Sequence, residues 1–160
     1  MTFQLVITHQ KGYDLQISCP SLGSQYIVSI PNHQLPVTVK RTAPVPTHIA
    51  TFKLNLFSKD WIILEGEEKK PLNTFMPTSS FSIFSCWYVF KGQDGIQYRW
   101  KLREDGPALF KGNIPIAAYY RKYKNEDKKY FQVYDSSLQN TLDYIILTLA
   151  IMETLSFRWC

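Results

Sequence analysis

The chain has 160 residues, the usual size of one domain, and a formal net charge of +5. Its 45% of hydrophobic residues excludes a disordered chain, and its 7 glycines and 9 prolines exclude a collagen-like or low-complexity protein. We therefore expect one mildly basic, aromatic-rich domain over residues 1–160.

The N-terminus and the cysteines point to a cytoplasmic protein. The first residues, MTFQLVITHQKGYDLQIS, lack the basic start and long apolar core of a secretory signal. Cys19, Cys86 and Cys160 are widely spaced and odd in number, unlike the even sets of disulfide frameworks. The longest apolar run, 144–152, is interrupted by Thr148 and would span about 13 Å as a helix against about 30 Å of bilayer core, so we expect no transmembrane segment.

Most of the chain reads as short strands. β-branched and aromatic side chains, or clean alternation, predict strands over 26–30, 37–40, 48–56, 61–64, 81–90, 96–103, 108–111, 115–124 and 129–134. Lys91-Gly-Gln-Asp-Gly95 predicts a tight hairpin, because Asp-Gly supplies the positive φ that such a turn needs.

The last element differs from the rest. Residues 136–140 offer helix caps, and the apolar positions between 142 and 155 cover nearly the whole circumference of a helix. A helix of this kind must be surrounded by protein or lipid, and it is too short to span lipid. Many strands before one such helix predict a closed barrel threaded by it. Asp143 and Glu153 would then need caps or partners near the helix ends, such as Arg158.

A weak internal sequence repeat, called the internal echo below, suggests two similar half-sheets. The order of Tyr26, Thr38-Val-Lys-Arg41 and Ile49-Ala50 is repeated by Tyr98, Leu109-Phe-Lys111 and Ile116-Ala117. The identities are few and the spacing drifts, so chance similarity is the alternative explanation.

Several segments together resemble a known family. They are Tyr26-Ile-Val-Ser-Ile30, Thr38-Val-Lys-Arg41, His48-Ile-Ala-Thr-Phe52, Asp94-Gly95-Ile-Gln-Tyr98-Arg-Trp100-Lys101, Ile116-Ala117-Ala-Tyr119, and Leu142-Asp143-Tyr-Ile-Ile-Leu-Thr148 followed by Glu153. In this order they resemble a fungal uncharacterised-domain family of the tubby C-terminal-like superfamily, which also holds the phospholipid scramblases. The resemblance covers roughly residues 24–158. It implies an antiparallel β-barrel of about a dozen strands around a central C-terminal helix. Tubby itself binds phosphoinositide headgroups through basic residues on its barrel, but that motif has no residue-by-residue counterpart in this chain.

Basic residues supply the best candidate site. The stretch 91–129 holds ten Lys or Arg and five Asp or Glu, a surplus equal to the net charge of the whole chain. Period two places Arg99, Lys101 and Arg103 on one strand face, and Lys111, Arg121 or Lys122 could stand nearby. Such a cluster would attract phosphate groups, and arginine would hold them bidentately. The alternative is a solvated outer face that keeps the protein soluble.

Other chemistries find little support in the sequence. His9, His33 and His48 lack ligand spacing, and no H-x-x-x-H, C-x-x-C, P-loop or G-x-S-x-G motif occurs, so we expect no metal, no cofactor and no catalytic residues. A pI near 9.1 is modest for a nucleic-acid binder, which makes that partner unlikely. Trp61, Trp87, Trp100 and Tyr134 read as core residues.

Two functions fit these observations. The first is a non-catalytic binding or scaffold module that docks on anionic phospholipid headgroups, phosphoinositides included, through the basic face at a membrane surface. The second is a protein-interaction or small-ligand module with no lipid role, whose contact surface is the loops at one barrel end. Hydrolysis would need convergent carboxylates or a nucleophile–base pair, and the sequence displays neither.

Overall fold

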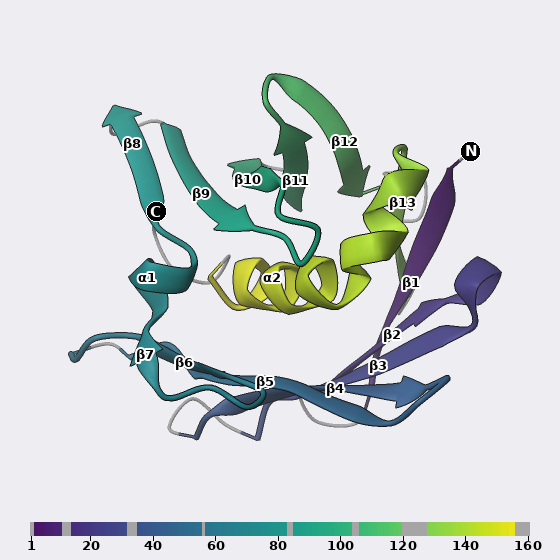
Figure 1. The fold of residues 1–160 in the computed structure, drawn as a ribbon, viewed down its shortest axis with the longest axis horizontal. Coiled ribbons are helices and arrows are strands. Elements are labelled where there is room, and N and C mark those ends of the chain that lie inside the picture. Colours follow the sequence, from purple (N-terminus) through teal and green to yellow (C-terminus); the bar gives the residue numbers. More distant parts are fainter. Residues whose placement is uncertain are drawn as a thin grey trace.

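One antiparallel sheet of 13 strands curls around a single helix (Figure 1). The structure is a computed structural model that describes residues 2–10, 14–31, 35–55, 57–82, 85–103, 106–119 and 128–155. The strands are β1 (Phe3–His9), β2 (Leu15–Cys19), β3 (Ser24–Ser29), β4 (Val37–Ala43), β5 (Thr47–Lys53), β6 (Trp61–Leu64), β7 (Lys70–Pro71), β8 (Thr78–Ser82), β9 (Ser85–Lys91), β10 (Gln97–Arg103), β11 (Gly106–Lys111), β12 (Ile114–Tyr119) and β13 (Lys128–Val133). The helical elements are η1 (Pro20–Leu22), α1 (Leu72–Phe75), η3 (Ser136–Thr141) and α2 (Leu142–Leu155).

The sheet is two meanders joined through its first and last strands. The strand order is β7-β6-β5-β4-β3-β2-β1-β13-β12-β11-β10-β9-β8. β1 pairs with β13 over six residue positions, from Phe3 opposite Val133 to Thr8 opposite Lys128. The two parts of the internal echo fall on three-strand meanders in the two halves, β3-β4-β5 and β10-β11-β12.

The sequence predicts a closed barrel, but the strands form an open sheet. β7 and β8 are the two edges of the sheet, and no pairing joins them in the described part of the chain. The short helix α1 connects them and lies beside the opening (Figure 1). Its Phe75 ring meets Tyr144 of α2 edge-on, with the ring centroids 5.5 Å apart. The sheet therefore surrounds the helix, while a helical turn rather than a strand ladder spans the gap.

α2 is buried on nearly all sides, as its sequence predicts. Ten of its 14 residues are buried, and only Asp143, Tyr144, Glu153 and Thr154 are partly accessible. The inner faces of the strands supply the surrounding apolar wall, with Phe52, Tyr98 and Trp100 fully enclosed. No helix among the described residues is long and apolar enough to cross a membrane.

Three polar contacts fix the helix within this wall. Asp143, Thr148 and Glu153 are spaced by five residues, which turns successive side chains about 140° around the axis. Asp143 meets β3 and β4, Thr148 meets β10, and Glu153 meets β12 and β13. Apolar contacts are non-directional, so these links determine how far the helix is rotated and inserted.

Several strand predictions differ from the structure. The strand expected over 48–56 ends at Lys53, and of the strand expected over 115–124 residues 120–124 lie outside the described residues. The single strand expected over 81–90 is wrong, because β8 and β9 are antiparallel partners, with Ser82 opposite Ser85. The chain reverses there without Gly or Pro to mark the turn. β1 and β2 were not predicted, although both alternate between buried and partly exposed residues. The hairpin at 91–95 is confirmed: Gly92 N–H donates to the Ile96 carbonyl, and Gly95 has φ 80°.

The predicted aromatic core is correct in part. Trp100 is fully buried, whereas Trp61 and Trp87 are only partly buried on the outer face, and Tyr134 is 52% exposed. Cations cover the two tryptophans on the outer face, since Lys69 lies over the Trp61 ring and Arg99 lies over the Trp87 ring. These contacts explain why both rings are partly buried outside the core.

The Thr148 contact gives a test of the helix position. The buried Thr148 hydroxyl accepts from Trp100 Nε1 at 2.8 Å and donates to the Tyr144 carbonyl at 2.7 Å. Thr148→Val keeps the shape but leaves the indole N–H without a partner, so we expect a loss of about 1–3 kcal/mol in the free energy of unfolding. Thr148→Ser retains the hydroxyl and serves as the control. Equal losses for both variants in denaturant unfolding would show that packing, not the hydrogen bond, matters here.

Candidate functional site

The outer surface of β9, β10 and β11 carries a row of cations on aromatic rings. Tyr98 and Trp100 of β10 point into the core, so Arg99, Lys101 and Arg103 lie on the opposite side, as predicted. We call these three cations, with the rings of Trp87 and Phe110, the cationic face.

Pairing across the strands explains how the rings and cations meet. Lys101 stands opposite Trp87 of β9, and Arg99 stands opposite Phe110 of β11. The Arg99 guanidinium lies 4.2 Å from the Trp87 ring centroid, the Lys101 ammonium lies 5.2 Å from it, and the Arg103 guanidinium lies 5.1 Å from that of Phe110. The two rings meet edge-on at 5.2 Å. These stacking contacts hold the stems of the cations against the sheet.

Of the remaining predicted site residues, the structure describes only Lys111. Arg99 Nη2 donates to the Gly112 carbonyl at 2.5 Å and to Asn113 Oδ1 at 3.1 Å, which ties the row to the β11–β12 turn. Lys111 ends β11 and is exposed, one residue beyond Phe110. Arg121 and Lys122 lie outside the described residues.

No carboxylate of the described residues neutralises the cationic face. Across the part of the chain that the structure describes, no ion pair to a carboxylate is formed by Arg99, Lys101 or Arg103. Glu104 and Asp105 follow Arg103 in the sequence and lie outside that part. The row can therefore offer several guanidinium and ammonium donors to anions outside the protein.

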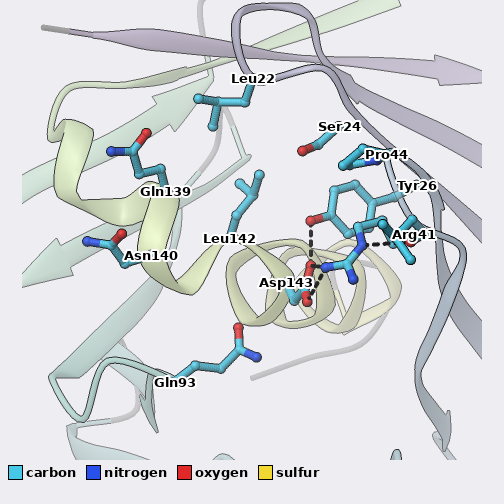
Figure 2. Close-up of a pocket in the computed structure, with 11 residues that line it drawn as sticks. Leu22, Ser24, Tyr26, Arg41, Pro44, Gln93, Gln139, Asn140, Leu142 and Asp143 are labelled. Atoms are coloured by element: carbon cyan, nitrogen blue, oxygen red, sulfur yellow. Dashed lines mark hydrogen bonds and ion pairs between the residues drawn. The ribbon is translucent and has the colours of Figure 1, made fainter.

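A second candidate is an open pocket at the end of the sheet where α2 begins (Figure 2). Its volume is about 490 Å³. Figure 2 shows Gln139 and Asn140 on one side of it, Gln93 below, and Tyr26 and Arg41 on the other side, around the first turn of α2. The β9–β10 turn is attached to this end by a hydrogen bond from Gln93 N–H to the buried Thr141 hydroxyl at 2.8 Å.

The charged groups of this end pocket neutralise one another. Arg41 Nη1 donates to both carboxylate oxygens of Asp143, at 3.0 and 2.8 Å, while Tyr26 Oη donates to Oδ1 at 2.5 Å. Thr47 Oγ1 and the Val45 carbonyl accept from the rest of the guanidinium, at 2.9 and 3.0 Å. Burial, and then the hydrogen bond to Asp143, raise the pKa of Tyr26 far above its usual range. The pair thus serves the fold first, and the polar side chains left to bind a ligand in the pocket are uncharged: the amides of Gln93, Gln139 and Asn140 and the hydroxyl of Ser24.

The other end of α2 repeats this arrangement. Tyr119 Oη donates to Glu153 Oε1, and Lys129 Nζ lies 3.8 Å from Glu153 Oε2. Burial and the nearby Glu153 carboxylate raise the pKa of Tyr119 well above its usual value. Arg158, the partner expected from the sequence, lies outside the described residues.

The structure also contains a nucleophile–base contact that sequence reasoning missed. His48 Nε2 lies 3.1 Å from Thr51 Oγ1, and His48 Nδ1 lies 2.7 Å from Glu65 Oε2. A spacing of three normally places two strand residues on opposite faces, but β5 has a bulge here: Ala50 pairs with Val39 and His48 with Lys40, which leaves Ile49 as the extra residue. Acyl transfer also needs a cavity for the acyl group, and the lining of the end pocket includes none of these three residues. We therefore interpret the contact as a surface hydrogen-bond chain.

Metal-binding clusters are not found in the described ranges, where no three His, Cys, Asp or Glu side chains gather. Cys19 is a buried free thiol whose pKa is raised by burial.

Comparison with known proteins places the chain in a family. The Family of unknown function (DUF6593) matches residues 11–156, which is most of the chain, so the chain belongs to this family. A search of curated proteins and a search of solved structures each found no match.

The Arg41–Asp143 pair should contribute strongly to stability. Asp143→Asn removes the charge that compensates a guanidinium only 24% exposed, so we expect a loss of about 2 kcal/mol, between the values for surface and buried pairs. Glu67→Gln breaks the more exposed Glu67–Lys70 pair and is the matched control, expected to change stability by less than about 0.5 kcal/mol. Equal effects of the two substitutions in chemical denaturation would contradict this assignment.

Alkaline pH should destabilise the fold through its buried phenols. Burial and carboxylate partners raise the pKa of Tyr26, Tyr98 and Tyr119, whereas tyrosines of the unfolded chain ionise near pH 10. A raised folded-state pKa contributes stability that is complete below about pH 10 and is lost as the pH rises further. We expect part of the phenolate absorbance to appear only together with loss of the circular dichroism signal. Full ionisation of all ten tyrosines in the folded protein would refute this expectation.

Proposed function

We propose that this member of the family is a non-catalytic binding module that docks on the anionic headgroups of a phospholipid membrane, phosphoinositides included, through the cationic face. The observation that carries the proposal is the row of Arg99, Lys101 and Arg103 held outward over Trp87 and Phe110. The proposal also places the protein in the cytoplasm, peripheral at the membrane surface.

The spacing of the row favours a surface of phosphates over one small anion. Alternate residues of a strand are about 7 Å apart, so three such cations cover about 13 Å. The cations are held over two different rings, so neighbouring headgroups of a bilayer suit the row better than one small anion. The aromatic rings limit the movement of the cations, which lowers the entropy lost when a headgroup binds.

The expected strength is modest. Each basic residue near an anionic surface contributes about 1 kcal/mol, so the row alone supports weak, salt-sensitive binding. The net charge of +5 adds long-range attraction to such a surface.

Kinship with the tubby C-terminal-like superfamily remains part of this proposal. An antiparallel sheet wrapped around one apolar helix supports it, and β7 and β8 would be the strands between which a closed relative seals its barrel.

A protein-interaction or small-ligand module is the alternative, favoured by the end pocket. Its uncharged lining of Gln93, Gln139 and Asn140 suits a neutral polar ligand or a peptide rather than a phosphate. Binding of this kind would be insensitive to charge reversal on β10.

Flotation with vesicles distinguishes the two functions. We expect the protein to float with vesicles of phosphatidylcholine and phosphatidylserine, and more strongly when a phosphoinositide is added, at low but not at high salt. The double variant Arg99→Glu/Lys101→Glu should abolish flotation, because it replaces attraction by repulsion.

A matched pair of substitutions controls for net charge. Lys40→Glu/Lys53→Glu changes the charge by the same amount on β4 and β5, in the other half of the sheet. It should retain most of the flotation. Loss of binding in both variants would reduce the effect to overall charge, and no salt-dependent flotation of the unaltered protein would end the lipid proposal.

A further inference from the structure

We propose that the β11–β12 turn is an apolar anchor that inserts Ile114 into the interface of an anionic bilayer while the cationic face binds its headgroups. This inference rests on the proposed function and deepens it. It assigns a membrane-inserting side chain, and it fixes which end of the molecule meets the lipid.

The turn exposes apolar surface that the fold does not require. Ile114 is 67% exposed and Pro115 is also exposed, whereas Ile116 and Ala117 immediately after them are buried. Residues 112–115 carry no charge, and the charged group opposite Ile114 in the hairpin is Lys111, a cation that can remain among anionic headgroups while Ile114 inserts.

Strand direction places this tip at the same end of the sheet as the end pocket. β9 ends and β10 begins at the turn that contacts Thr141, just before α2. Because the strands alternate in direction, β11 also ends and β12 begins at this end. We call this end the N-terminal rim, because α2 begins there. Figure 1 shows the β11–β12 connection projecting at the margin of the molecule.

Further side chains at the N-terminal rim suit an interface. Tyr134 is 52% exposed, and its N–H donates to the Ile116 carbonyl at 2.8 Å, so it lies beside the start of β12. Tyrosine favours the headgroup level of a bilayer because its ring is apolar and its hydroxyl is polar. The neighbouring Asp135 carboxylate accepts from Ser137, and Lys111 attracts it, so it is partly compensated.

A direct hydrogen bond joins the anchor to the cationic face. Arg99 donates to Gly112 and Asn113, the two residues before Ile114. The arginine closest to the rim therefore holds the turn in place, and it would enter the headgroup layer as Ile114 enters the hydrocarbon boundary. Lys101 and Arg103 follow along β10 from the anchor, and in this proposal they contact the neighbouring headgroups.

A bilayer, rather than a protein groove, is the occupant that this combination favours. Charges alone bind weakly to membranes, and stable attachment generally adds a buried apolar group as a second contribution. Burial of one isoleucine side chain strengthens partitioning by about tenfold or more. The convex tip of a hairpin with cations behind it matches a surface that is apolar inside and anionic outside.

The test compares Ile114→Asp with Phe57→Asp. Phe57 is fully exposed in the β5–β6 connection, at the opposite end of the sheet, so the control adds the same charge to an equally accessible apolar position. Partition coefficients are measured by flotation with vesicles of phosphatidylcholine and phosphatidylserine, at low and high salt. We expect Ile114→Asp to bind about tenfold more weakly, Phe57→Asp to bind like the unaltered protein, and Ile114→Leu to retain binding.

The outcomes separate this inference from the proposed function. If the unaltered protein floats and Ile114→Asp floats equally well, the anchor is wrong and electrostatic docking stands. If both aspartate variants lose binding to the same extent, added negative charge explains the effect and the anchor is again wrong. If the unaltered protein does not float with anionic vesicles, the proposed function fails and the anchor fails with it. Thermal unfolding of each variant verifies that the turn substitution leaves the fold intact.

Discussion

The enclosure of α2 determines everything else in this molecule. A helix that is apolar on nearly every side gains stability only if protein covers its whole circumference, and a curled sheet does this with one continuous layer. Apolar burial does not specify how α2 is rotated about its axis, so the polar residues at 143, 148 and 153 are needed to position the helix. Each projects in a different direction and meets a different part of the wall. The two carboxylates are partly buried charges, and each is compensated by a phenol and a cation, which avoids the cost of leaving it unpaired.

This arrangement also restricts where function can reside. The inner face of every long strand is committed to the core, so binding groups are confined to outer faces, edges and rims. On β9–β11 the outer face carries rings as well as cations, and these rings are not needed by the core. Phe110 is almost fully covered although it belongs to no part of the inner cluster, since Trp87 and Arg103 pack over it. A second, thin layer of packing therefore exists outside the sheet at the place where positive charge is concentrated.

The spacing of apolar residues along the chain predicts those helices and strands whose side chains keep one regular period from end to end. The circumference of α2, the Asp94-Gly95 turn and the alternation of β10 follow from the sequence because each depends on neighbouring residues only. The β8–β9 reversal and the opening between β7 and β8 depend on pairing between segments, which no local pattern reports. The bulge at Ile49 shifts the period within one strand and so hides the His48–Thr51 contact. In the candidate site, the alternation of β10 predicts that Arg99, Lys101 and Arg103 share one face. The stacking of Arg99 on Trp87 could not be predicted, because a tryptophan at that position would suit the core equally well.

Charge and shape together distinguish the two candidate surfaces. In the end pocket the charged donor among the described residues, Arg41, directs its nitrogens to Asp143, Thr47 and Val45. Breaking these hydrogen bonds would release the first turn of the buried helix. An anion bound there would therefore compete with the fold itself. On the cationic face the guanidinium of Arg103 and the ammonium of Lys101 contact rings rather than carboxylates of the described chain, so an external anion adds an interaction without removing one. The energetic cost of binding is lower on the outer face, which supports the proposal of an extended anionic surface over that of a small anion held in the end pocket.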